Sequence, residues 1–128
     1  MTLVNIKDWL KTLIGDIGEG ISTNAIDTGL EHCIGVFDRT VGDDNPSAYS
    51  GASTYGRWRI AVLVHWGRDP TACSAKARAI CDLLDARNYH TVGGCRSFTE
   101  TVGSPISLGK DDSGISEYKI EFTLIYNK

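Results

Sequence analysis

The C-terminal segment constrains the fold of this chain more than any other part of the sequence. From residue 117 to residue 127, polar and apolar side chains alternate with a period of two. One side carries apolar or aromatic residues, namely Tyr118, Ile120, Phe122, Leu124 and Tyr126. The other side carries mainly polar residues, namely Glu117, Lys119, Glu121, Thr123 and Asn127. This period is typical of an antiparallel strand with one buried face, so we expect the chain to end in a strand that closes a sheet.

The length and composition fit one globular domain. The chain has 128 residues, 41% hydrophobic and 23% charged, which is enough for one hydrophobic core but not for two. The longest apolar run, residues 60–64, is far shorter than the roughly 20 residues that span a bilayer. The N-terminus lacks a basic segment followed by an apolar one. We expect residues 1–128 to form a single soluble, cytosolic domain without a membrane partner.

A first helix is expected near the N-terminus. Apolar residues recur at spacings of three and four between Leu3 and Ile14, as on one face of an α-helix. Asn5, followed by Asp8, resembles an N-cap, and Gly15 is suited to end the helix.

Three further segments are expected to be extended. Residues 21–26 favour a short strand, and residues 32–41 favour a longer one whose buried face is ambiguous. The clearest strand covers residues 57–66, where one face is apolar and the other is apolar in its middle. Such a strand is expected to be covered on both faces at its centre.

An alanine-rich helix is expected after this strand. Asp69 is suited to be its N-cap and Pro70 its first residue, where the missing N–H costs nothing. The apolar stripe continues to about residue 87, and Asn88 is suited to cap the end. Residues 95–102 then favour another strand.

This order of elements predicts an α+β fold. A mainly antiparallel sheet, with the N-terminal helix and the central alanine-rich helix packed against it, suits strands that are not regularly interleaved with helices. A doubly wound parallel sheet is the alternative. Two polar loops, residues 42–56 and 103–114, lie outside these elements. The first exceeds the usual length of a connection, and is either a solvated hairpin tip or a segment ordered only by a neighbouring molecule.

Charge is distributed unevenly along the chain, although its net value is only −3. Residues 1–56 contain three basic and eight acidic side chains, residues 57–87 six and three, and residues 88–128 four and five. The net charge gives no support to general nucleic-acid binding. The distribution is either ordinary scatter or the mark of a subunit that stacks head to tail on its own copies.

Sequence patterns typical of catalysis are missing. The chain has no G-x-S-x-G, no G-x-x-x-x-G-K-[ST] and no G-x-G-x-x-G, which argues against a nucleophile elbow and against phosphate loops. A nucleophile would require Cys33 or Cys95 beside His65 or His90, and the sequence shows no activating partner. We expect neither enzyme activity nor a cofactor.

The cysteines are expected to be small buried thiols. On one helix, Cys73 and Cys81 would lie roughly 12 Å apart, at about 1.5 Å per residue, which is too far for a disulfide. Neither C-x-x-C nor H-x-x-x-H spacing occurs, so no metal site is expected.

Charged and aromatic residues of the loops and of the central strand form the candidate interaction site. The paired acids lack the spacing of a calcium loop, so solvated turns are favoured over a cation site. The three arginines favour a sheet face that meets water or an acidic partner over a phosphate site. The candidates for protein contacts are Asp43, Asp44, Tyr49, Tyr55, Arg57, Arg59, Arg68, Lys110, Asp111 and Asp112.

Three stretches carry a resemblance to a known family. They are residues 58–67 (WRIAVLVHWG), the alanine-rich helix with ICDLL at residues 80–84, and residues 104–126 (SPISLGKDDSGISEYKIEFTLIY). Over about the last 70 residues, the chain resembles the tail terminator and minor capsid proteins of long-tailed bacteriophages. In that family an initial helix precedes the first strand, a central strand leads into a helix, and an acidic turn leads into a long last strand.

The resemblance implies a non-enzymatic, structural virion protein. Its copies would form a ring, usually a hexamer, that caps the growing tail tube and later joins the head connector, in a virion made in the bacterial cytoplasm. The implied partners are other copies of the chain, the tail tube protein and the head-completion protein. The alternatives are a phage head-completion or neck protein, a tail-tube or baseplate subunit, and a small cytosolic ligand-binding or Cys/His enzyme domain.

Overall fold

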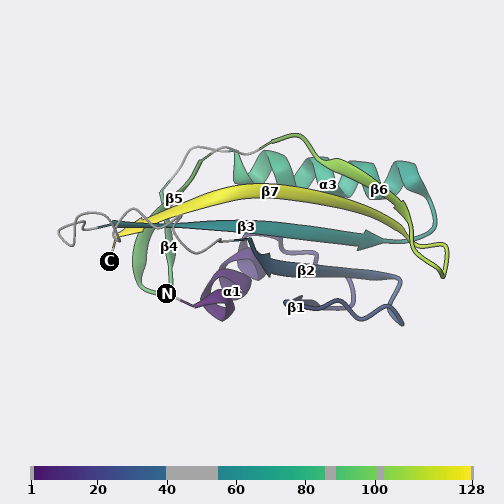
Figure 1. The fold of residues 1–128 in the computed structure, drawn as a ribbon, viewed down its shortest axis with the longest axis horizontal. Helices are drawn as coiled ribbons and strands as arrows, with labels where there is room; N and C mark the ends of the chain where they lie inside the picture. Colours follow the sequence, from purple (N-terminus) through teal and green to yellow (C-terminus); the bar gives the residue numbers. More distant parts are fainter. Residues whose placement is uncertain (1, 40–54, 86–88, 101–102, 128) are drawn as a thin grey trace.

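The computed structural model describes residues 2–39, 55–85, 89–100 and 103–127 (Figure 1). Within these ranges there are two helices, α1 (Leu3–Ile14) and α3 (Pro70–Leu84). The same ranges contain one sheet of seven strands, β1 (Ile21–Thr23), β2 (His32–Asp38), β3 (Tyr55–Trp66), β4 (His90–Val92), β5 (Cys95–Glu100), β6 (Ile106–Lys110) and β7 (Ser116–Asn127). This arrangement confirms the predicted α+β class with a mainly antiparallel sheet.

The C-terminal strand β7 lies in the middle of the sheet. The strand order is β1-β2-β3-β7-β5-β4, and β6 also pairs with β7. One edge of β7 pairs antiparallel with β3, from Tyr55 opposite Asn127 to His65 opposite Glu117. Its other edge is shared, because β5 pairs with the C-terminal half and β6 with the N-terminal half. The last segment of the chain therefore joins the two parts of the sheet.

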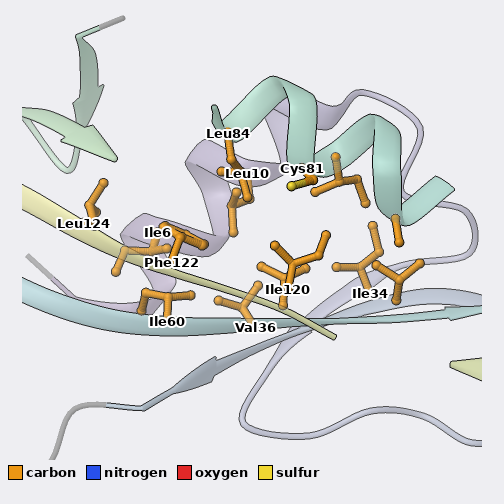
Figure 2. Close-up of a cluster of buried hydrophobic side chains, with 14 of the residues drawn as sticks. Ile6, Leu10, Ile34, Val36, Ile60, Cys81, Leu84, Ile120, Phe122 and Leu124 are labelled. Carbon is orange, nitrogen blue, oxygen red and sulfur yellow. The ribbon is translucent and has the colours of Figure 1, made fainter. Parts of the chain in front are cut away.

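Both helices pack against the same face of this sheet. The even-numbered residues of β3 and β7 point to that face, with Val62 opposite Ile120, and meet the apolar residues of α1 and α3 in one core. Figure 2 shows Leu10 of α1 and Leu84 of α3 beside this layer of side chains. Each fully buried aliphatic side chain contributes roughly 1.5–3 kcal/mol to folding, so this layer is the main source of stability.

The N-cap of the first helix lies three residues before the predicted N-cap. Thr2, and not Asn5, is the N-cap: its hydroxyl accepts a hydrogen bond from the Asn5 amide, at 3.2 Å. The Asn5 side chain in turn accepts one from the Thr2 amide, at 2.8 Å, which completes a capping box. Gly15 ends the helix as predicted, with a positive φ of 79°.

The second helix is close to its prediction at the start and shorter at the end. The Asp69 carboxylate accepts a hydrogen bond from the Thr71 amide, at 3.0 Å, and Pro70 occupies the first turn. The helix ends at Leu84 with Asp85 as its C-cap, earlier than residue 87, and Asn88 lies outside the described residues. Neither described helix is long and apolar enough to cross a membrane.

Several strand bounds differ from the prediction. β3 begins at Tyr55, so the end of the predicted 42–56 loop belongs to a strand, and the rest of that loop lies outside the described residues. The prediction of a loop at residues 103–114 is wrong in part, because the strand β6 occupies the middle of this segment. The short strand β4 was not predicted. All five residues of β6 are exposed, and a strand without a buried face shows no alternation of apolar residues.

The sheet face opposite the helices is covered at one end. Within the described residues, the segment 24–31, which connects β1 to the parallel strand β2, crosses this face and buries Cys33 and His65. The segment approaches β2 at Gly35, where an added Cβ would lie 3.2 Å from the Ala25 carbonyl oxygen. We call the remainder of this face, formed by odd-numbered residues of β3 and β7 with the adjoining β5, the open face.

Candidate functional site

The predicted site residues fall at opposite ends of β3. Arg57 and Arg59 lie near its start and project from the open face, while Arg68 follows its end. A strand of 12 residues spans roughly 40 Å, so these arginines belong to two separate surfaces. The structure describes only the backbone of Tyr55, as the first residue of β3, and Asp43, Asp44 and Tyr49 lie outside the described residues.

At the start of β3, a row of side chains crosses three strands. Arg57 lies opposite Ile125 of β7, which lies opposite Phe98 of β5. The Arg57 guanidinium is 3.3 Å from the Glu100 carboxylate. The row borders a hollow of about 470 Å³. We call it the arginine–aromatic hollow; its lining includes Arg57, Tyr89, Arg96, Phe98, Glu100 and Ile125.

Two aromatic rings give this hollow an apolar wall. Tyr89 is 64% exposed and Phe98 38% exposed, and their rings pack edge to face at 5.8 Å. The Arg96 guanidinium lies over the Tyr89 ring, 4.1 Å from its centroid, a cation–π contact. Exposed aromatic and arginine side chains together are typical of the centres of protein interfaces. Sequence reasoning identified Arg57 here but missed Tyr89, Arg96 and Phe98, because they come together only through strand pairing.

The middle of the open face carries paired charges. The Glu121 carboxylate is 3.2 Å from the Arg39 guanidinium and 3.1 Å from the Lys119 ammonium. Exposed ion pairs contribute about 0–1 kcal/mol to stability, so these contacts organise the surface more than they stabilise the fold. They give this part of the sheet a polar surface on which a partner can form charged hydrogen bonds.

At the far end of β3, three of the predicted residues meet in one cluster. Arg68 donates to the Ser113 carbonyl oxygen, at 2.7 Å, and the Lys110 ammonium donates to the Arg68 carbonyl oxygen, at 3.2 Å. Asp111 accepts from the amides of Ile115 and Ser113, each at 2.9 Å. The hydrogen bond from Ile115, followed by that from Ser113, lowers the pKa of Asp111. These contacts hold the β6–β7 turn, whereas the neighbouring Asp112 is exposed.

A buried histidine, which sequence reasoning did not assign to the site, anchors this end. His65 is fully buried, with Nε2 2.9 Å from the Leu30 carbonyl oxygen and Nδ1 3.0 Å from the Glu117 carboxylate. The Asp111 carboxylate is 3.7 Å from Nε2. His65 therefore links β3, β7, the crossing segment 24–31 and the β6–β7 turn. In the sequence, the only indication of this role was that His65 falls on the half-apolar face of the strand predicted at residues 57–66.

The three buried cysteines, Cys33, Cys73 and Cys81, are poorly suited to act as nucleophiles. Cys33 and His65 are direct neighbours across the β2–β3 pair, yet burial raises the pKa of the Cys33 thiol to about 11 and both histidine nitrogens have other partners. Burial also raises the pKa of Cys73 to about 11 and raises that of Cys81. Thiols that stay protonated are poor nucleophiles and poor metal ligands. In the part of the chain that the structure describes, no cluster of three or more metal-binding side chains is found.

A family of known proteins matches most of this chain. The family described as bacteriophage tail terminator protein matches residues 11–128, which is nearly the whole chain. The chain belongs to the bacteriophage tail terminator family. A search of curated proteins finds no match.

The family assigns a structural role in the phage tail and confirms the resemblance seen in the sequence. Tail terminators are structural proteins and are not known as enzymes. The open face and the two ends of β3 are thus the surfaces on which contacts with other tail or head proteins are to be sought.

Proposed function

We propose that copies of this chain close into a ring that caps the tail tube and later joins it to the head connector. The observation that supports the ring is the one-sided packing of the sheet. Both helices cover one face, and the open face keeps paired charges and half-exposed aromatic residues. A ring needs two unlike, complementary surfaces on each subunit, and this asymmetric subunit has unlike surfaces.

The edge strand β6 is the surface that we assign to the axial neighbours, the tail tube protein and the head connector. Ile106 and Leu108 are each 47% exposed. Among the described residues, β6 pairs only with β7, so its outer backbone edge has no strand partner. An unpaired strand edge is a template for pairing with another chain, and an added partner strand gains main-chain hydrogen bonds there. The predicted contact loop 103–114 contains this strand, which supports the assignment.

The mass of the protein in solution tests the ring. Sedimentation of the concentrated protein, alone and with purified tail tubes that lack their terminator, is expected to show a species of about six times the 13.9 kDa subunit. Negative-stain images of that species are expected to show an annulus with a central hole. A protein that stays monomeric under both conditions would contradict the ring. Binding to heads without tails would instead favour a neck protein.

A further inference from the structure

Arginines lie at the start of β3, whereas a segment rich in acidic residues lies at its other end, near Arg68 and Lys110. The arginine–aromatic hollow lies at the start of the strand, with Arg57 and Arg96 at its rim. Segment 12–31 contains four acidic residues and no basic one, and it meets the other end of the strand, where the Gly67 amide donates to the Glu31 carbonyl oxygen. Arg57 and Trp66 are nine residues apart on β3, about 30 Å along a strand. We call residues 12–31 the acidic end.

The carboxylates of the acidic end are accessible. Asp16, Glu19, Asp27 and Glu31 are all exposed. Two of them have a basic partner within the subunit. The Lys76 ammonium is 4.0 Å from the Asp16 carboxylate, and the Arg68 guanidinium is 3.6 Å from the Glu31 carboxylate. Among the described residues, no lysine or arginine pairs with Glu19 or Asp27, and the nearest ionisable partner of Glu19 is His32, whose Nδ1 lies 4.0 Å from its carboxylate. These two carboxylates therefore retain their capacity for an external cation.

The turn that carries Asp27 is compact and exposed. The Asp27 carboxylate accepts from the Gly29 amide at 2.9 Å, and the Leu30 amide closes the turn on the Asp27 carbonyl oxygen at 3.1 Å. Residues 27–29 are exposed. His65 holds this turn from beneath through the Leu30 carbonyl oxygen. A turn that its own subunit already holds loses little entropy when it binds.

We propose that the arginine–aromatic hollow of one copy receives the Asp27 turn of the next copy, with Glu19 at the rim. This contact deepens the proposed ring and rests on it. Guanidinium groups bind carboxylates with two parallel hydrogen bonds, and Tyr89 and Phe98 supply an apolar wall that excludes water from them. Because the two surfaces differ and lie at opposite ends of the subunit, each copy offers one to each neighbour, which is a head-to-tail contact.

Charge reversal with rescue tests this pairing. Arg96→Glu and Asp27→Arg are each expected to weaken self-association by about tenfold or more, measured by sedimentation velocity. The double variant Arg96→Glu/Asp27→Arg is expected to restore it, because the two charges exchange places. Arg96 is preferred to Arg57 because Arg57 also forms the Glu100 ion pair within the subunit. Arg78→Glu is the control, since Arg78 is equally charged and exposed on α3.

Each outcome decides one level of the hypothesis. If the wild-type protein forms rings and Arg96→Glu does not weaken them, this contact is wrong and the ring stands. If both single variants fail and the double variant also fails while keeping the wild-type melting temperature, the two surfaces bind other partners and not each other. If the wild-type protein never forms rings, the proposed function fails and the contact fails with it.

Discussion

His65 Nδ1 lies 3.0 Å from the Glu117 carboxylate across the β3–β7 pair, and the imidazole is fully buried. Its Nε2 lies 2.9 Å from the Leu30 carbonyl oxygen. A carbonyl oxygen and a carboxylate both accept hydrogen bonds, so the imidazole is the donor in this arrangement. This contact fastens the crossing segment, and with it the Asp27 turn, to the far end of β3.

The His65 contact predicts a large loss of stability on substitution. His65→Phe keeps a ring of similar size but leaves the Leu30 carbonyl oxygen and the Glu117 carboxylate without their donor. We expect the free energy of unfolding to fall by about 2–4 kcal/mol, measured by urea denaturation. His32→Phe, at a half-exposed position, is the control and is expected to change it by less than about 1 kcal/mol. Equal effects of the two variants would show that His65 acts only as a space filler.

Thiol reactivity follows from the burial of the cysteines. Cys95 is partly exposed, whereas Cys33, Cys73 and Cys81 are buried and have raised pKa values. At neutral pH we expect an alkylating reagent to modify Cys95 first and the other three only after unfolding. Mass spectrometry of peptides locates the modified residues. Rapid modification of Cys33 in the folded protein would revive the Cys/His enzyme alternative.

His90 predicts a loss of stability in mild acid. Burial lowers the pKa of His90 below its usual 6.5, and its ring packs against Trp9 at 5.1 Å. Below about pH 6.5 the unfolded chain therefore binds a proton that the folded protein resists, so stability falls as pH falls. His90→Phe keeps the ring contact and removes this titration. Urea midpoints at about pH 7.5 and about pH 5.5 should differ less in this variant than in the wild type or in His32→Phe.

The chain between β2 and β3 is predicted to serve assembly and not folding. Replacing residues 44–54 with a glycine–serine linker of equal length spares Tyr55, which begins β3. We expect the melting temperature to change little and tail termination to be lost, because this polar segment carries Asp44 and Tyr49, two of the proposed contact residues. Complementation of a phage that lacks its terminator measures the second effect. Full complementation would remove the segment from the proposed interface.

Ring formation is expected to weaken with salt. The proposed contact brings arginines to carboxylates near the protein surface, where the screening length falls from about 10 Å at 0.1 M to about 3 Å at 1 M salt. Sedimentation across this range should show a shift from rings to smaller species. Rings that persist unchanged at 1 M salt would mean that apolar contacts, such as those of Phe98, carry the assembly.

The strands and helices that pack on the core were predictable from the sequence. The alternation from Tyr118 to Tyr126 gave the inward face of β7, and Asp69 with Pro70 gave the start of α3, because burial on one face and end capping leave local patterns. β6 left no such pattern, since all of its residues are exposed. The N-cap was misplaced because Thr2 and Asn5 cap each other and both residue types suit the position.

The sequence by itself determined the class of the fold, the absence of recognised catalytic patterns and the family to which the chain belongs, because these depend on periodicity and on residue order. Only the tertiary structure decided which residues share a surface. Arg57, Phe98 and Arg96 meet through the pairing of β3 with β7 and of β7 with β5, and His65 meets Leu30 because a connection crosses the sheet. Such neighbours are distant along the chain, and strand register and packing, which no local pattern encodes, bring them together.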